Sequence, residues 1–180
     1  MKYLFILLMT PFLLNASIKI AVIGDSVTNG YGLSKGECYV ELLEKRYATE
    51  GKKVKILNYS FDGATTEDAK ILTIYVLAAE KPDYFITLLG FNDSVLDFSL
   101  EKLKSNFFEI YAKASFNCKG VILGGVNTQN IRPNYNKTLL ETYQFIVETL
   151  PVCPVMLLGP EVLIHAQDSI HPNAEGHKLM

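Results

Sequence analysis

Three polar residues, far apart in the chain, have the types and the spacing that nucleophilic catalysis requires. Ser26 follows a short apolar run, residues 18–23, that ends at Gly24. A serine hydroxyl is a weak nucleophile unless a base removes its proton and a third group orients that base. His171 stands three residues after Asp168, so one turn of chain can point both side chains the same way. We therefore take Ser26 as candidate nucleophile, His171 as base and Asp168 as acid.

Each of these residues also has a simpler interpretation. Ser26 could serve only as the N-cap of a following helix, and the segment around His171 could be an ordinary surface turn. The other histidines, His165 and His177, have no such acidic neighbour, and we expect them to be solvent-facing or to cap helices.

A hydrolase also needs hydrogen-bond donors for the oxyanion that develops during attack. Asn92 lies in the segment 90–93, where its side-chain amide could supply one donor. Gly63 lacks a Cβ, so its backbone N–H could approach a substrate closely, and the Ser26 N–H would be a third donor. The alternatives are that Asn92 forms a turn and that Gly63 only provides a positive φ.

The chain that must position these residues alternates between strand-like and helix-like segments. Mainly apolar runs predict five strands, at residues 18–23, 54–59, 84–89, 121–123 and 155–158. Apolar stripes at helical spacing predict helices at residues 39–47, 66–80, 100–114 and 139–150. Strands that are apolar throughout are buried on both faces, which predicts an α/β fold with a doubly wound, five-stranded parallel sheet between two helical layers.

In such folds, sites form beyond the carboxyl ends of the strands. The unusual polar residues follow three of the predicted strands, in the segments 24–26, 60–63 and 90–93. Their coincidence at these strand ends is the main indication of function that the residues themselves give.

Four segments resemble the sequence blocks of the SGNH, or GDSL, hydrolases, in the order of that family. They are Gly24-Asp25-Ser26, Gly63, Gly90-Phe91-Asn92-Asp93 and Asp168-Ser169-Ile170-His171-Pro172-Asn173. The resemblance implies a three-layer, flavodoxin-like sandwich without metal or cofactor. It also implies signature residues at Ser26, Gly63, Asn92 and His171, with Asp168 as the triad acid.

The segments 24–32 and 131–143 are similar to the bacterial thioesterase I, arylesterase and lysophospholipase subgroup. This similarity implies a serine esterase that forms an acyl-enzyme from small ester or thioester substrates, such as short-to-medium acyl esters, acyl-CoA, lysophospholipids or aryl esters. Apolar residues in the expected loops 91–98 and 126–135 favour the same substrates. The alternatives are a carbohydrate or peptidoglycan O-acetylesterase and an inactive SGNH-like domain that only binds acyl groups or glycans.

The N-terminus has the pattern of a secretory signal peptide. Lys2 precedes an apolar run, residues 3–14, and small residues follow at Ala16 and Ser17. We expect a signal peptide at 1–16 and one hydrolase domain at 17–180 that ends in a shortened helix of about two turns. The run is short for a membrane span, so we expect export to the periplasm or medium, with an uncleaved N-terminal anchor as the alternative.

Charge and cysteine content limit the partners. The formal net charge of −2 provides no basic surface for nucleic acid, so a small-molecule partner is expected. The cysteines are Cys38, Cys118 and Cys153, and their spacing does not suggest zinc. Cys118 and Cys153 each precede a predicted strand, so they could form a disulfide at one end of the sheet, or all three thiols could be free.

Overall fold

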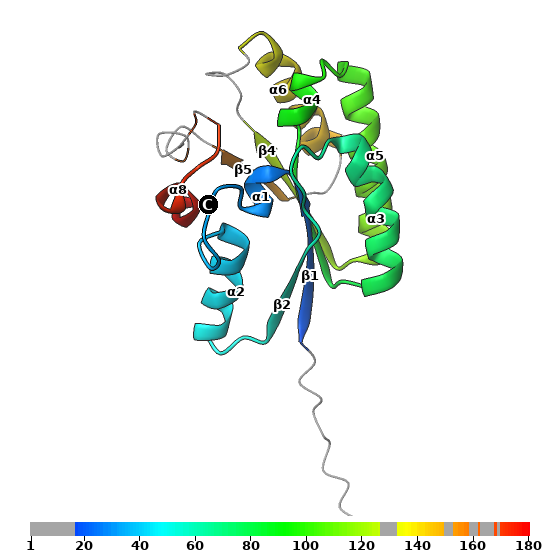
Figure 1. The fold of residues 1–180 in the computed structure, drawn as a ribbon. Coiled ribbons are helices and arrows are strands. Elements are labelled where there is room, and N and C mark those ends of the chain that lie inside the picture. The colour runs from blue at the N-terminus through cyan, green and yellow to red at the C-terminus, as the bar shows by residue number, and fades with distance from the viewer. Residues whose placement is uncertain (1–16, 127–132, 150–152, 159–161, 163–167, 169) are drawn as a thin grey trace, which may run out of the picture.

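A five-stranded parallel sheet forms the centre of the molecule, as the sequence predicts (Figure 1). The computed structural model describes residues 17–126, 133–149, 153–158, 162, 168 and 170–180. The strands are β1 (Ile18–Gly24), β2 (Val54–Asn58), β3 (Tyr84–Leu88), β4 (Gly120–Val126) and β5 (Cys153–Leu158). Their order in the sheet, β2-β1-β3-β4-β5, is that of flavodoxin-like folds, in which ligands bind where the winding reverses, between β1 and β3.

Helices cover both faces of the sheet, in agreement with the predicted three layers (Figure 1). The described helices are α1 (Ser26–Asn29), α2 (Tyr39–Thr49), α3 (Thr66–Glu80), α4 (Phe91–Val95), α5 (Leu100–Asn117), α6 (Pro133–Thr149) and α8 (Ala174–Leu179). Helices α3, α5 and α6 share one hydrophobic core with Ala21 and Ile23 of β1, on one face of the sheet. Helix α2 packs on Ile20 and Val22, which point to the opposite face. This two-sided burial explains why β1 is apolar from Ile20 to Ile23, the part of the strand that both helical layers cover.

Local sequence sets the ends of the longer helices. Thr65 and Asp68 form a capping box at the start of α3, and its observed bounds equal the predicted ones. Helix α6 begins at Pro133, earlier than its apolar stripe predicted, because proline is well suited to the first turn of a helix. The predicted loop 91–98 is partly wrong, because residues 91–95 form the short helix α4, which follows Gly90.

The possible pairing of Cys118 with Cys153 is not observed, and the Cys118 thiol is free. In the sheet register Cys153 lies opposite Ile122, four residues beyond Cys118. Four residues of strand span about 13 Å, and the Cα atoms of a disulfide lie within about 7 Å. Cys38 is also a free thiol, and it is buried.

The proposed signal peptide, residues 1–16, lies outside the described residues. Within the part of the chain that the structure describes, no helix combines the length and the hydropathy needed to span a bilayer.

Candidate active site

Ser26 is the first residue of helix α1, directly beyond the carboxyl end of β1. The N-cap is Asp25, whose carboxylate accepts a hydrogen bond of 3.1 Å from the Val27 N–H. The interpretation of Ser26 as the N-cap is therefore wrong, and its hydroxyl is not used to begin the helix. Gly24 permits this tight turn, because a Cβ at that position would lie 2.3 Å from the Thr28 hydroxyl oxygen.

The structure brings Ser26, His171 and Asp168 into one chain of hydrogen bonds. His171 Nε2 lies 2.8 Å from Ser26 Oγ, and His171 Nδ1 lies 2.7 Å from Asp168 Oδ2. The imidazole thus bridges the hydroxyl and the carboxylate, so Nδ1–H can donate to Asp168 while Nε2 accepts from Ser26. This is the geometry required of a nucleophile, its base and the group that orients the base.

Asp168 also fixes the backbone of the turn that carries His171. Its Oδ1 accepts hydrogen bonds from the N–H groups of Ile170, at 3.0 Å, and of His171, at 2.7 Å. The backbone N–H of His171, the imidazole and the N–H of Ile170 hold the pKa of Asp168 down at about 2. Asp168 is half exposed, as expected for a surface turn. Its ionised carboxylate nevertheless holds the imidazole of His171 in place, so the segment is more than an ordinary turn.

The segment after His171 is anchored by helix α8. Asn173 caps this helix by accepting hydrogen bonds from the N–H groups of Glu175 and Gly176. His177, on α8, is buried, and its Nδ1 accepts a hydrogen bond of 3.1 Å from the Tyr39 N–H at the start of α2. His177 therefore caps a helix, as one of the two expectations had it, but it is not solvent-facing. Burial lowers its pKa to about 4 and keeps it neutral near pH 7.

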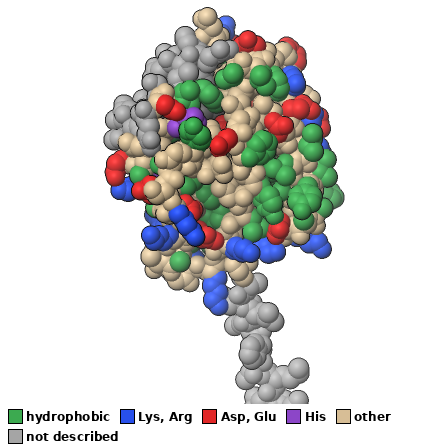
Figure 2. All heavy atoms as spheres, viewed as in Figure 1, with side chains coloured by type: hydrophobic (Ala, Val, Ile, Leu, Met, Phe, Trp, Pro, Cys, Tyr) green, Lys and Arg blue, Asp and Glu red, His purple; other side chains and the backbone are tan. Residues whose placement is uncertain are grey.

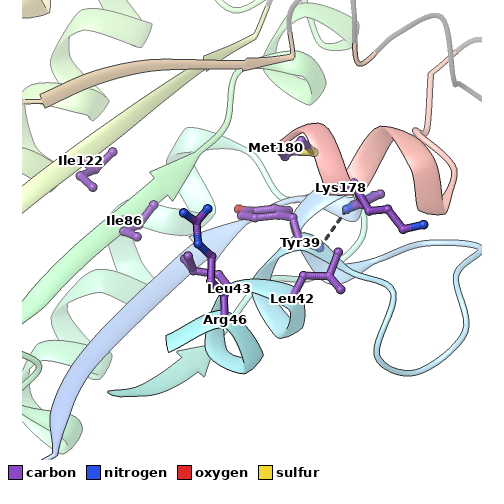
Figure 3. A pocket seen from close by; sticks show the side chains of 9 residues that line it. Tyr39, Leu42, Leu43, Arg46, Ile86, Ile122, Lys178 and Met180 are labelled. Carbon is purple, nitrogen blue, oxygen red and sulfur yellow. Dashed lines mark hydrogen bonds between the residues drawn. The ribbon is translucent and has the colours of Figure 1, made fainter. Parts of the chain in front are cut away.

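A pocket of about 250 Å³ lies beside this anchor, between α2, α8 and the sheet (Figure 3). Its walls include Leu42 and Leu43 of α2, Ile86 of β3 and Ile122 of β4. The described residues that line it include none of Ser26, Asp168 and His171, so this pocket is separate from the candidate active site.

The two other candidate donors, Gly63 before α3 and Asn92 in α4, lie at the same edge of the sheet as Ser26. Leu88, near the end of β3, is paired with Gly24 of β1, and the Phe61 N–H donates to the Gly24 carbonyl. Gly63 has a φ of 80°, a conformation that favours glycine. The Asn92 side-chain amide donates to the Ala64 carbonyl at 3.0 Å, which joins the two loops.

Two further residues next to the hydrogen-bonded chain of Ser26, His171 and Asp168 were not given a role from the sequence. The ring centroids of Tyr31 and His171 are 4.6 Å apart, and about half of Tyr31 is exposed. Asp25 is buried directly before Ser26, and burial raises its pKa to about 7. The position of Asp25 next to Ser26 in the sequence could have marked it as a residue near the site. Its burial and the contact of Tyr31 with His171 depend on tertiary structure.

The surface around this edge contains both apolar and acidic side chains. Figure 2 shows histidine atoms at the surface, with hydrophobic and acidic side chains nearby. Among the described residues, no group of three or more His, Cys, Asp or Glu side chains is arranged to hold a metal ion. The chemistry that this arrangement offers is proton transfer between a hydroxyl, an imidazole and a carboxylate.

Comparison with known proteins identifies the family. The model of the GDSL-like lipase/acylhydrolase family matches residues 22–179, which include all the residues of the hydrogen-bonded chain. The protein belongs to the GDSL-like lipase/acylhydrolases. The resemblance stated from the sequence blocks is therefore confirmed, and the protein is a hydrolase of this family.

Curated relatives of this GDSL-type hydrolase cover most of its length. Esterase TesA of Pseudomonas aeruginosa is 30% identical over 166 residues, which are 87% of this chain and 81% of the relative. Thioesterase 1/protease 1/lysophospholipase L1 of Escherichia coli is 24% identical, over 100% of this chain and 87% of the relative. Both names describe enzymes that hydrolyse esters or thioesters.

Solved structures agree with the fold. A crystal structure of TesA matches with a TM-score of 0.82 and 28% identity, and covers 89% of this chain and 93% of that one. The SGNH-hydrolase esterase AlinE4 matches with a TM-score of 0.75 and 26% identity, over 91% and 90% of the two chains. The predicted flavodoxin-like sandwich of the SGNH type is thus confirmed.

Proposed function

We propose that this GDSL-type hydrolase is a serine esterase that hydrolyses ester and thioester bonds through an acyl-enzyme on Ser26. The observation that supports this proposal most directly is the hydrogen-bonded chain from Ser26 Oγ through His171 to Asp168, with distances of 2.8 and 2.7 Å. In the first step, His171 Nε2 takes the Ser26 proton as Oγ attacks the substrate carbonyl carbon. Asp168, ionised because its pKa is about 2, stabilises the imidazolium that results.

The tetrahedral intermediate places a negative charge on the former carbonyl oxygen. The donors proposed for it are the N–H groups of Ser26 and Gly63 and the side-chain amide of Asn92. An amide nitrogen has two hydrogens, so the bond from Asn92 to Ala64 fixes the amide plane and leaves one hydrogen for the oxyanion. Such preorganised donors lower the barrier because they need no rearrangement as charge develops.

Collapse of the intermediate completes the reaction. His171 gives its proton to the departing alcohol or thiol, the C–O or C–S bond breaks, and the acyl group stays on Ser26. A water molecule then attacks the acyl carbon while His171 accepts its proton. Release of the carboxylic acid restores the Ser26 hydroxyl, so the net reaction consumes one water for each ester bond broken.

The proposed substrates are uncharged acyl esters, acyl-CoA thioesters, lysophospholipids and aryl esters of short-to-medium chain length. Exposed apolar side chains on the loops near the catalytic chain support this choice: Tyr31 follows α1, Phe61 precedes Gly63, and Leu96 follows α4. Phe91 is partly buried against Val27 and Leu88. The names of the relatives, esterase and thioesterase 1/lysophospholipase L1, support the same substrate class.

An acyl-chain series tests the proposal. p-Nitrophenyl esters from acetate to palmitate and matching acyl-CoA thioesters are compared with an O-acetylated glycan, using the purified wild-type protein. We expect turnover of the p-nitrophenyl esters and one fluorophosphonate adduct per chain, on the peptide that contains Ser26. Acetate release from the glycan alone would replace the esterase proposal with an O-acetylesterase, and absence of both turnover and labelling would reject catalysis.

We also propose export directed by residues 1–16. The position of β1 supports this, because it begins at Ile18 and cleavage after Ala16 would leave the strand whole. Mass determination of the protein recovered from the periplasm and medium of an expressing bacterium tests it. Full-length protein confined to the cytoplasm would contradict export, and full-length protein in the membrane fraction would indicate an uncleaved anchor.

A further inference from the structure

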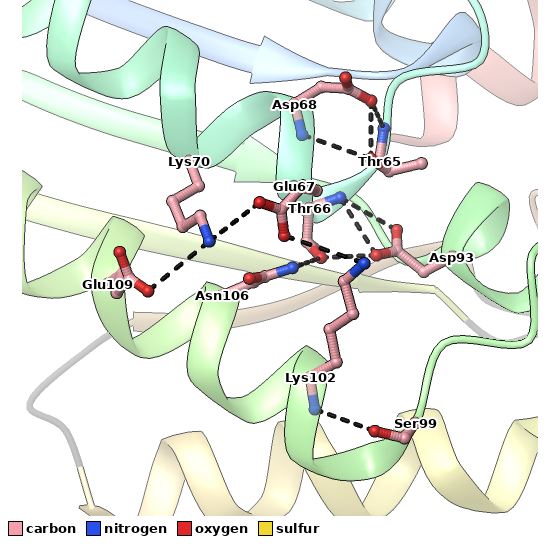
Figure 4. A network of polar contacts seen from close by, with 10 residues as sticks. All are labelled: Thr65, Thr66, Glu67, Asp68, Lys70, Asp93, Ser99, Lys102, Asn106 and Glu109. Carbon is pink, nitrogen blue, oxygen red and sulfur yellow. Dashed lines mark hydrogen bonds and ion pairs between the residues drawn. The ribbon is translucent and has the colours of Figure 1, made fainter.

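Asp93 is an acidic residue with no exposed surface, next to Asn92 in the short helix α4. Its two carboxylate oxygens accept hydrogen bonds of 3.1 Å each from the Thr66 N–H. The Thr66 hydroxyl donates to the same carboxylate and accepts from the Asn106 amide at 2.9 Å (Figure 4). Placing a carboxylate in the interior is costly unless such donors surround it.

These contacts connect the two segments that carry proposed oxyanion donors, residues 63–66 and the short helix α4. Thr66 is the first residue of α3, three residues after Gly63, and Asp93 directly follows Asn92. The Asn92 amide donates in the reverse direction, to the Ala64 carbonyl. Asn92 and Asp93 of α4 are thus bound to Ala64 and Thr66. A displacement of either segment would change the separation of Gly63 from Asn92.

The contacts of Asp93 are not needed to cap α3, because that helix already has a capping box. The Thr65 hydroxyl accepts from the Asp68 N–H, and the Asp68 carboxylate accepts from the Thr65 N–H at 2.9 Å (Figure 4). Asp68 is exposed, whereas Asp93 is fully buried, and it lies in the first turn of α3, as Thr66 does. Its hydrogen bonds among the described residues are to Thr65, so it offers a control that supports the same helix end without a hydrogen bond to α4.

We propose that Asp93 is a positioning residue: by binding Thr66 at the start of α3, it sets the separation of the oxyanion donors Gly63 and Asn92. This inference rests on the proposed function, since it assigns a role in the same site. Asp93 does not contact the reacting atoms in this account, and it acts through Gly63 and Asn92. Its loss should raise the energy of the tetrahedral intermediate more than that of the bound substrate, so kcat should fall and KM should change little.

The test compares Asp93→Asn with Asp68→Asn on p-nitrophenyl butyrate. Loss of well-placed oxyanion donors costs on the order of 100-fold, so partial misplacement in Asp93→Asn should lower kcat about 10- to 100-fold with KM within about threefold. Phenylboronic acid forms a tetrahedral adduct on an active-site serine, and its inhibition constant should rise by a similar factor. Asp68→Asn should keep kcat and the inhibition constant within about twofold while it lowers the urea midpoint.

Two further variants keep the inference testable if Asp93→Asn does not fold. Thr66→Val keeps the shape and the N–H but removes the hydroxyl, and we expect a kcat loss of about three- to tenfold, on the scale of one hydrogen bond. Adding Asn92→Ala to a folded Asp93 or Thr66 variant should lower kcat by a smaller factor than Asn92→Ala does in the wild type. The reason is that both changes affect the same set of oxyanion donors.

The outcomes separate this inference from the proposed function. If fluorophosphonate labels Ser26 in the wild type but Asp93→Asn and Thr66→Val keep kcat and boronate affinity within twofold, Asp93 is only structural and the inference is wrong. Equal losses in the Asp93 and Asp68 variants would overturn it in the same way. Failure of the wild type to be labelled or to hydrolyse the ester would instead reject the proposed function.

Discussion

His171 Nε2 lies 2.8 Å from Ser26 Oγ, although the two residues are 145 positions apart in the sequence. Ser26 reaches this place because β1 and the short helix α1 hold it at the edge of the sheet. His171 reaches it because Asp168 fixes the turn and α8 anchors the chain beyond it. The contact is therefore produced by two independent pieces of local structure, and each can be tested separately.

Replacement of the acid tests how His171 is oriented. In Asp168→Asn, the side chain can still accept backbone hydrogen bonds, but it cannot stabilise an imidazolium as a carboxylate does. We expect kcat on p-nitrophenyl butyrate to fall about 100- to 1,000-fold, less than for a buried acid because Asp168 is half exposed. The thermal midpoint measures folding in parallel. Near-wild-type kcat in a folded variant would show that Asp168 does not serve His171.

Removal of the Asn92 amide tests the proposed oxyanion donor in α4, the short helix that follows β3. Asn92→Ala loses the donor and leaves the Ala64 carbonyl without this bond, so kcat should fall about 100-fold while Ser26 still reacts slowly with fluorophosphonate. Asn92→Asp is a useful partner variant, because it keeps the size but replaces the donor with an acceptor and should be at least as impaired. Unchanged kcat in both variants would exclude Asn92 from the site.

Replacement of Tyr31 tests whether its contact with His171 assists protonation of the imidazole during catalysis. An aromatic ring 4.6 Å from the imidazole can stabilise the imidazolium by about 0.5 to 1 kcal/mol, which corresponds to roughly two- to fivefold in rate. Tyr31→Leu should lose this factor in kcat, whereas Tyr31→Phe, which keeps the ring, should not. Equal rates in all three proteins would assign the ring to substrate contact or to no role.

His177 predicts a dependence of stability on pH. Its pKa falls from an ordinary value of 6.5 to about 4 in the folded protein, so protonation favours the unfolded chain. The stability that it contributes is complete above pH 6.5 and is lost as the pH falls towards 4, by up to about 3 kcal/mol. Urea unfolding of wild type and His177→Asn at several pH values measures this. Asp25 has a raised pKa in both proteins, so its opposite slope cancels in the difference.

A stability difference between wild type and His177→Asn that stays constant from pH 7 to pH 4 would contradict burial of a neutral imidazole. Activity at pH 7 is a second check, because a loosened α8 should weaken the anchor of the His171 turn. We expect a modest loss of kcat in the variant.

Much of the fold was predictable because its signals are local. Mainly apolar strands indicated the two-sided burial of the sheet, and the helical pattern at residues 66–80 gave both ends of α3. Helices α1 and α4 were missed because four or five residues give no helical periodicity. The possible Cys118–Cys153 pair was wrong because it depended on strand register, which the residue pattern does not carry.

The candidate site was predictable in its residues but not in its supports. Ser26, Asp168 and His171 were identified by type, spacing and family resemblance, and the structure joins them. The burial of Asp25 and Asp93 was not foreseen, because in a sequence an aspartate beside glycine or asparagine indicates a turn or a cap. Whether such a carboxylate is buried depends on which elements pack over it, and this is decided by tertiary contacts.

The most direct test of the central claim is the rate of p-nitrophenyl butyrate hydrolysis by purified Ser26→Ala protein. Its fold should be intact by circular dichroism, because Asp25 and not Ser26 caps α1. We predict that turnover falls to the rate of the buffer and that fluorophosphonate labelling disappears. Turnover equal to that of the wild type in the folded variant would show that Ser26 is not the nucleophile.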